Sequence, residues 1–309
     1  MTQGAVIPIG GDQPECWPSA RLGGWLDTCA TLQLWTQMVG KVRLALTPKE
    51  NHWWNVPLYL SARGLATSPI PYDSRHFELE FDFISHDLIL RASEGRMLKL
   101  PLRPVAVADF YRQFLDLLHA ADIKVKIWPM PVELPSPIPF DQDRQHASYD
   151  REVARVLWTI LRSADRVFHR FRAGFIGKNS PVHFFWGSFD LAVTRFSGRP
   201  APPRPNADAI TREAYSHEVS SVGFWPGSFQ SPVQAAAFYA YAAPEPPGFR
   251  NAPVRPAAAY YHSELGEFLL DYEAVRASPS PSAALLEFCQ TTYAAAADLG
   301  HWDRAALEA

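Results

Sequence analysis

The residues best suited to acid/base chemistry lie in the segment 206–234, which contains Glu213, Tyr215 and His217. In a helix, Glu213 and His217 share a face because they are four residues apart, and in an extended chain all three share one. Either conformation brings a carboxylate and an imidazole together, as general acid/base catalysis requires. The simpler alternative is that Glu213 takes part in helix capping or pairing and that His217 lies on the surface.

A second group of candidates lies in the strand-like segment 182–196. In one regular strand, His183 and Arg195 lie on one face and Asp190 lies on the other. Aspartate is uncommon inside strands, so Asp190 lies on an exposed face, accepts backbone hydrogen bonds while buried, or belongs to a site. We therefore predict a catalytic set made of His217, Glu213, Asp190 and His183.

Other side chains have the chemistry of ligand contacts. Lys178 follows a glycine and precedes a strand, so its ammonium group either contacts an anion or faces solvent. Helix capping at 148–150 does not explain the nearby His146. Tryptophans more often belong to a core, but they can also form the walls of a cleft for a flat ligand. The predicted substrate-binding set is Arg195, Lys178, Tyr215, Trp186, Trp225, Trp54 and His146.

A metal site and a cofactor both stay open at this stage. Glu213 and His217, together with His183, could hold a divalent metal, but their spacing follows no metal-binding pattern. The sequence also lacks the nucleophile elbow, the phosphate-binding glycine loop, the dinucleotide fingerprint and the zinc-protease helix. No cofactor and no reaction can therefore be named from motifs.

An internal repeat is expected to position these residues. The string LWT at 34–36 recurs at 157–159, and the strings around Trp54 and Gly95 resemble those around Trp186 and Gly266. Period-two alternation and short glycine-containing turns predict antiparallel strands with helices packed on one face. We predict an α+β fold with a tandem internal duplication, in which each half is helix, antiparallel strands, helix, and a pseudo-twofold axis relates the halves.

The predicted organisation follows from this repeat and from clusters among the 28 prolines, which disfavour helix and central strand. It consists of a loose N-terminal tail (1–20), a first repeat (21–127), a proline-rich linker (128–145) and a second repeat (146–309) with an inserted loop (206–234).

Composition limits the possible partners and the compartment. The net charge is −3 without a basic block, which argues against nucleic acid and anionic membranes as partners. Only three cysteines occur, they are scattered, and no secretory signal or long apolar run is present. We expect a cytoplasmic protein of unknown oligomeric state that does not enter a membrane.

Several long strings carry a resemblance to a known family: NHWW, TSPIPY, SPVHFFWGSFDLAVTRFSGR and TREAYSHEV. With them, the stretch from about 17 to 304 resembles a family of bacterial proteins known only as a domain of unknown function. The resemblance implies a single-module bacterial protein. It implies no activity, cofactor or catalytic residue.

These observations predict a cytoplasmic enzyme that acts by general acid/base chemistry on a small anionic molecule in a cleft between the repeats. The alternative is a non-catalytic small-molecule-binding or scaffold protein with the same cleft. Convergence of His217, Glu213 and Asp190 would favour the enzyme, and scattered positions would favour the alternative.

Overall fold

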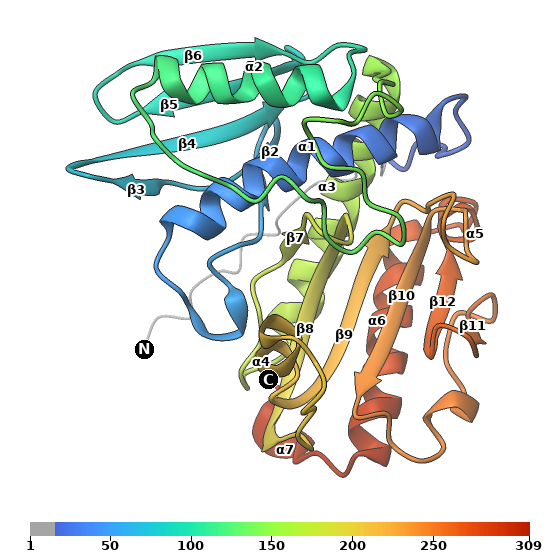
Figure 1. The fold of residues 1–309 in the computed structure, drawn as a ribbon. Helices are drawn as coiled ribbons and strands as arrows, with labels where there is room; N and C mark the ends of the chain where they lie inside the picture. The colour runs from blue at the N-terminus through green and yellow to red at the C-terminus, as the bar shows by residue number, and fades with distance from the viewer. Residues whose placement is uncertain (1–15) are drawn as a thin grey trace, which may run out of the picture.

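Two six-stranded antiparallel sheets, each with its own helices, make up residues 16–309, which are the residues that the structure describes (Figure 1). The structure is a computed structural model. The elements of the first unit are α1 (Trp25–Leu46), the short 3₁₀ helix η1 (Asn51–Trp53), β1 (Tyr59–Leu60), β2 (Gly64–Ala66), β3 (Ile70–Tyr72), β4 (Arg75–Asp82), β5 (Asp87–Ala92), β6 (Met97–Pro101) and α2 (Val107–Ala120).

The second unit begins with a long helix and ends with several. Its elements are α3 (Arg151–Ala173), β7 (His183–Phe185), β8 (Asp190–Pro200), α4 (Ala209–Ala214), β9 (His217–Trp225), β10 (Ala237–Ala243), η2 (Phe249–Asn251), β11 (Tyr260–His262), β12 (Glu267–Asp271), α5 (Tyr272–Arg276), α6 (Pro281–Leu299) and α7 (Arg304–Leu307). The predicted α+β class is confirmed, and the predicted duplication stays a prediction.

Both sheets are antiparallel throughout. The first has the order β1-β2-β4-β5-β6, with β3 also paired to β4, and the second has the order β11-β12-β10-β9-β8-β7. Leu58 and Phe184 exchange two backbone hydrogen bonds of 2.9 Å, which link the edge of one sheet to the edge of the other. The two units therefore share a backbone contact.

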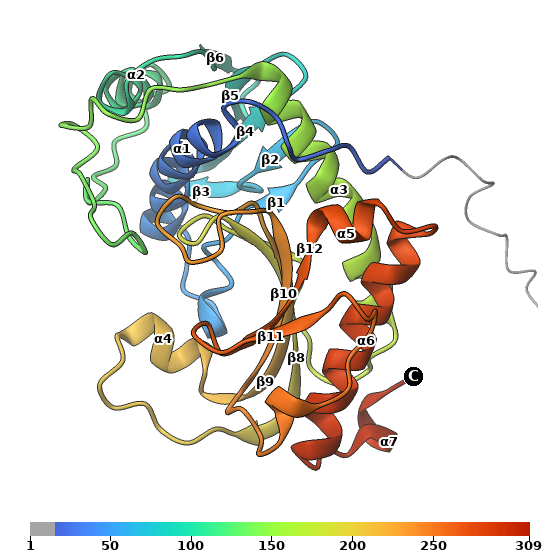
Figure 2. The ribbon, with the colours of Figure 1, turned by 90° about the vertical axis from the view of Figure 1, so that its right-hand side faces the viewer.

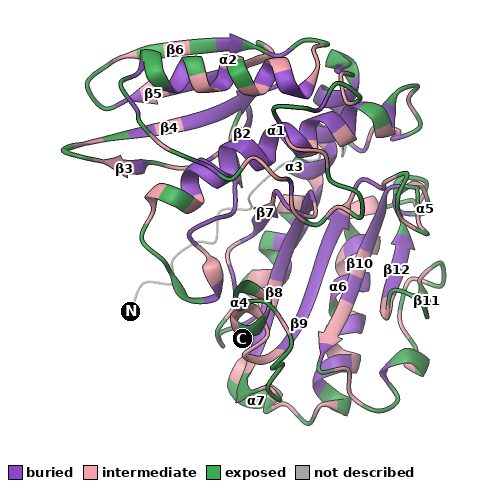
Figure 3. Ribbon diagram, in the orientation of Figure 1, coloured by how far each residue is buried: buried purple, intermediate pink, exposed green. Residues whose placement is uncertain are grey.

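Helices cover one face of each sheet. In the second unit, α3 and α6 lie against one face, and the strands curve around the opposite face (Figure 2). The sequence sets the start of α3, since the Asp150 side chain accepts hydrogen bonds from the backbone N–H groups of Glu152 and Val153. Buried residues are concentrated in α1, α3 and the strands β8 and β9 (Figure 3).

The predicted proline-rich linker is a strap across α1. The Gln37 side chain donates to the carbonyl of Val132 at 2.9 Å and accepts from its N–H at 2.8 Å. Lys41 adds a hydrogen bond of 2.9 Å to the carbonyl of Met130. These bonds fix the strap over the concave face of the second sheet.

Two of the predicted boundaries need correction. Residues 206–234 are not an inserted loop, because they contain β9, which pairs with β8 on one side and β10 on the other. The expected tail is not loose where the structure describes it. Trp17 is buried, and the hydroxyl of Tyr272 donates to the carbonyl of Pro18 at 2.5 Å. Residues 1–15 of the predicted tail lie outside the described residues.

Candidate functional site

A cavity of about 1080 Å³ lies between the two units. The concave face of the second sheet forms one wall, and α1, η1, the strap and the α4 segment form the others. Aromatic and aliphatic side chains together predominate in this lining, which includes the tryptophans Trp53, Trp54, Trp128, Trp186 and Trp225. Such a space suits a flat, largely apolar molecule.

One end of the cavity is acidic. The hydroxyl of Ser188 donates to Oδ1 of Asp190 at 2.5 Å, and the hydroxyl of Tyr239 donates to Oδ2. Asp190 is buried, and its burial raises its pKa despite these two hydrogen bonds. The carboxyl group of Asp190 thus forms part of the wall with both oxygens occupied.

Two further carboxyl groups face the same end. Burial, and then the charge of Asp190, raise the pKa of Glu133 and that of Glu267 to about 7. Glu133 is exposed, but the surface that it exposes lines the cavity. Within residues 16–309 neither glutamate has a basic partner at ion-pair distance. This end therefore carries acid groups that no basic side chain neutralises.

Two backbone features accompany the position of the Glu133 carboxyl group, namely a left-handed φ angle at Glu133 and a glycine at 187. The φ angle of Glu133 is 56°, in the left-handed region that non-glycine residues seldom adopt. A Cβ atom added to Gly187 would lie 2.1 Å from Oε1 of Glu133, so a glycine is needed for the carboxyl group to fit there. Strain of this kind persists mostly where function requires it.

The opposite end of the cavity is formed around His52. Nζ of Lys178 lies 2.6 Å from Nε2 of His52, and Nδ1 of His52 lies 3.0 Å from the carbonyl oxygen of Glu213. The Glu213 carboxylate accepts from the His52 backbone N–H at 3.0 Å and pairs with Lys49 at 2.5 Å. The imidazole of His217 lies 5.9 Å from that of His52, centroid to centroid. His52, which the sequence analysis did not single out, is therefore the common neighbour of three predicted residues, Glu213, His217 and Lys178.

The predicted His183 lies apart from this group. It is completely buried, and neither ring nitrogen has a hydrogen-bond partner. The ring centroid of Trp54 lies 5.8 Å from that of His183, and Trp54 also contacts the ring of His52. Burial and the nearby charges of Arg43 and Arg172 lower its pKa to about 3. His183 is therefore neutral near pH 7, and it lines the cavity beside Trp54 and Phe185.

Asp190 does not converge with His217 and Glu213, which is the arrangement that would have favoured an enzyme. Leu191, next to Asp190, pairs with Phe224, whereas His217 pairs with Pro200 at the far end of the same two strands. At ~3.3 Å per residue these positions are roughly 30 Å apart. The polar residues of the second unit therefore form two separate groups.

The predicted binding role of Arg195 is also wrong. A turn at 186–189 separates β7 from β8, so His183 and Asp190 share the cavity face and Arg195 points to the helices. Its guanidinium lies 3.6 Å from the Phe171 ring centroid and 4.3 Å from that of Tyr293, and it donates to the Phe171 carbonyl. Arg195 belongs to the core between β8, α3 and α6.

His146 lies outside the cavity lining as well. Its Nδ1 is 2.8 Å from Oδ2 of Asp143, and its carbonyl accepts from the N–H of Val107 at the start of α2. Hydrogen bonding to Asp143 raises the pKa of His146. This histidine stabilises the end of the strap.

The predicted aromatic contacts do line the cavity, namely Trp54, Trp186, Tyr215 and Trp225. Trp186 is fixed in place, because its Nε1–H donates to the carbonyl of Val56 at 2.8 Å and its ring packs on Gly40. The predicted residues that face the cavity are these aromatic residues, His183 and Asp190. Three others lie beside His52 at the edge of the cavity, namely Lys178, Glu213 and His217.

Over residues 16–309 no group of three or more histidine, cysteine, aspartate or glutamate residues is arranged to hold a metal ion. In the same part of the chain, no helix is long and apolar enough to cross a bilayer.

The fold and the site define an α+β protein with a large aromatic cavity between two sheet-and-helix units. Residues 17–309 match the model of a family of unknown function, DUF5996, and the chain belongs to this family. No curated protein and no solved structure matches the chain.

The site residues that the sequence did not reveal are His52, Glu133, Tyr239 and Glu267. Glu133 stands between prolines in a segment that reads as a linker, and His52 stands in a first half that reads as the less polar one. Both reach the cavity through contacts with residues far away in the chain. The sequence offers one weak signal, the pair of prolines around a lone glutamate in PVELP.

Proposed function

We propose that this protein is an enzyme that acts by general acid/base catalysis on a small molecule held between the two units. The observation that carries the proposal is the cavity, with Glu133 and Glu267 facing its interior and each having a pKa of about 7. A carboxyl group that titrates near neutral pH can both give and take a proton. Burial, and then the charge of Asp190, keeps the two glutamates partly protonated.

The walls of the cavity favour a ligand with a flat, apolar body. Five tryptophans supply large rigid surfaces for it. The three carboxyl groups repel an anionic group at their end of the cavity. The anionic group expected from the sequence fits better beside a lysine, either Lys41 or Lys126 in the lining or Lys178 at the rim. A cytoplasmic location is part of this proposal.

The second candidate is a non-catalytic protein that binds the same ligand. It is favoured by the predominance of aromatic and aliphatic side chains in the lining, as in a carrier, and by the separation of Asp190 from His217 and Glu213. Under this proposal, the carboxyl groups would only orient the ligand.

We also propose that the two units arose by duplication. Both contain five strands paired in the same antiparallel order, β1-β2-β4-β5-β6 and β7-β8-β9-β10-β12. The helices α1 and α3 begin 126 residues apart, at Trp25 and Arg151, and the paired residues Leu58 and Phe184 are also 126 apart. This offset differs from the alignment of Trp54 with Trp186 expected from the sequence strings.

Mass spectrometry of a cell metabolite extract, incubated with purified protein, tests the proposed function. We expect at least one compound to be consumed by the wild type and by Asp82→Asn, a control on the other sheet, but not by Glu133→Gln. A compound that binds without being consumed would overturn the enzyme proposal and support the second candidate. An extract with nothing bound and nothing consumed would overturn both.

A further inference from the structure

The contacts of His52 determine which of its ring nitrogens carries the proton. Nδ1 lies 3.0 Å from the carbonyl oxygen of Glu213, and a carbonyl can only accept, so Nδ1 carries the hydrogen. Nε2 therefore presents a lone pair, and the nearest polar atom to it is Nζ of Lys178 at 2.6 Å. This is the arrangement of a nucleophile, a base and a group that orients the base.

The backbone around His52 holds this arrangement in place. His52 and Trp53 have φ angles of 54° and 59°, so two consecutive residues without a glycine adopt the left-handed region. The His52 N–H is held by the Glu213 carboxylate at 3.0 Å. The imidazole is buried, and its orientation is set by residues of both units.

Lys178 lies at the rim of the cavity, where it is exposed to solvent and adjoins residues of the lining. Its Nζ is 4.9 Å from the ring centroid of Phe196 and 5.4 Å from that of Trp54, and both rings line the cavity. Unlike Lys49, which pairs with Glu213, Lys178 has no carboxylate at ion-pair distance within the described part of the chain. Partial desolvation lowers the pKa of the Lys178 ammonium group even though the residue is exposed, and burial followed by the Lys178 charge lowers the pKa of His52.

We propose that Lys178 is a nucleophile that forms an imine with an aldehyde or ketone ligand, and that His52 is its base. The ammonium group gives one proton to Nε2 of His52, and the free amine then forms a bond to the carbonyl carbon. The carbonyl oxygen takes that proton from the imidazolium. A second proton moves from nitrogen to oxygen by the same route, the oxygen leaves as water, and a protonated imine remains.

This chemistry goes beyond the proposed acid/base function, because it uses the opposite end of the cavity and needs none of the carboxyl groups. It requires no co-reactant besides the carbonyl compound. The proposal therefore gives a covalent role to a lysine that the sequence describes as either an anion contact or a solvent-facing residue.

Reductive trapping tests the proposal. The protein is incubated near pH 7 with benzaldehyde, a flat aromatic aldehyde, and cyanoborohydride, which reduces an imine to a stable secondary amine. Peptide mapping then gives the labelling rate of each lysine. We expect Lys178 to be labelled at least about tenfold faster than Lys49 and Lys126, and Lys178→Arg to remove that signal.

His52→Asn provides the matched variant, since asparagine tolerates the left-handed backbone but is no base. We expect it to slow the labelling of Lys178 about tenfold while the melting temperature stays within a few degrees of the wild-type value. Labelling of Lys178 no faster than that of Lys49 and Lys126, or an unchanged rate in His52→Asn, would overturn the proposal. Either result would leave the acid/base proposal standing, because trapping does not depend on Glu133.

Discussion

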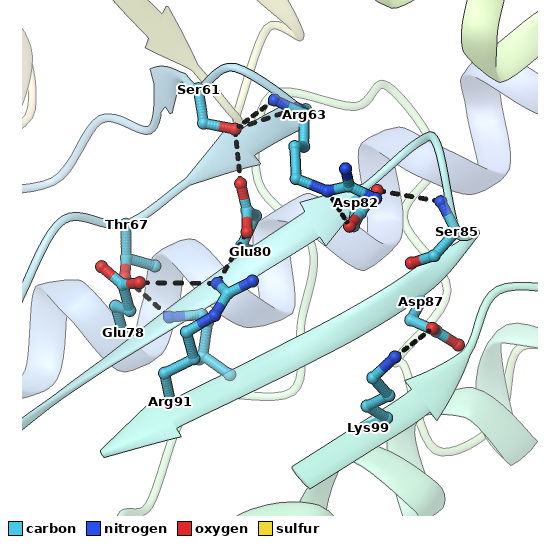
Figure 4. Close-up of polar contacts among 12 residues, drawn as sticks. Ser61, Arg63, Thr67, Glu78, Glu80, Asp82, Ser85, Asp87, Arg91 and Lys99 are labelled. Carbon is cyan, nitrogen blue, oxygen red and sulfur yellow. Dashed lines mark hydrogen bonds and ion pairs between the residues drawn. The ribbon is translucent and has the colours of Figure 1, made fainter. Parts of the chain in front are cut away.

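Each sheet has one face that its own helices leave uncovered, and these two faces differ in how their acidic side chains are partnered. On the first sheet, acidic side chains of β4 meet basic ones: Arg63 pairs with Asp82 at 2.5 Å, and Arg91 pairs with Glu80 at 2.6 Å (Figure 4). Lys99 pairs with Asp87 at 3.2 Å on the neighbouring strands. On the second sheet, the corresponding face forms the cavity wall, and Glu133 and Glu267 approach it without basic partners.

The difference shows in the titration of the carboxyl groups. Burial alone would raise the pKa of Asp82, but hydrogen bonds from Arg63 and from the N–H groups of Ser85 and Ile84 bring it below its ordinary value. The pKa values of Glu133 and Glu267 are raised to about 7. Paired charges therefore stabilise the first sheet, whereas the unpaired acids beside the second sheet are the groups to which we assign proton transfer in the proposed function.

The largest expected effect comes from filling the cavity. Thr194→Trp places an indole on the cavity face of β8, where Thr194 lines the lumen. We expect it to weaken binding of the fluorescent dye 1-anilinonaphthalene-8-sulfonate by more than about tenfold, because the dye loses its space. Glu78→Trp on the first sheet is the control and should bind the dye as the wild type does. Equal binding by the two variants would contradict the assignment of the cavity.

Loss of a paired charge should weaken the first sheet. Asp82→Asn should lower the free energy of unfolding by about 1–2 kcal/mol in urea at about pH 7, after allowance for the partial exposure of Arg63. The folded pKa of Asp82 is depressed, so this stabilisation exists above its unfolded pKa of ~3.9 and is lost as the pH falls through the folded value. A variant as stable as the wild type at neutral pH would show that the pairing of Asp82 with Arg63 does not stabilise the first sheet.

Loss of an unpaired charge should have the opposite sign. The pKa of Glu133 is raised to about 7, above its unfolded value of ~4.3, so the folded state binds the extra proton. Wild-type stability relative to Glu133→Gln should therefore fall as the pH rises from ~4.3 to ~7. Thermal unfolding across this range measures the trend. A wild type that gains stability relative to the variant over the same range would show that Glu133 is a paired, structural charge.

The smallest effect on stability is expected at Gly187. A Cβ at this position would meet the end of the flexible Glu133 side chain rather than backbone. Gly187→Ala should change the unfolding free energy by less than about 0.5 kcal/mol, yet displace the Glu133 carboxyl group and weaken turnover of any substrate found. Unchanged turnover would mean that the position of this carboxyl group is not critical.

The sequence revealed the parts of the fold that follow from local patterns. Alternation in FELEFDFI and short turns correctly predicted antiparallel strands. β9 was missed because HEVSSVGFW carries two consecutive serines and titratable residues that read as a loop. The turn at 186–189 reversed the expected faces of β8, since period-two reasoning holds only within an unbroken strand.

The site was harder to predict because its groups come from distant parts of the chain. Lys178 and Glu213 were recognised by residue type, but their partner His52 is more than 120 residues away from each of them. Glu133 meets Asp190 only because the strap crosses α1, and no local pattern encodes that crossing. Long-range packing thus determines which polar residues become a site.

The most direct test of the contrast between the two sheets is one carbon-13 NMR titration of the glutamate and aspartate side-chain carboxyl groups. The account predicts that Glu133 titrates near pH 7 and Asp82 below its ordinary range, with each resonance assigned by its loss in Glu133→Gln or Asp82→Asn. Titration of both carboxyl groups below about pH 5 would contradict the claim that the second sheet holds unneutralised acids for catalysis.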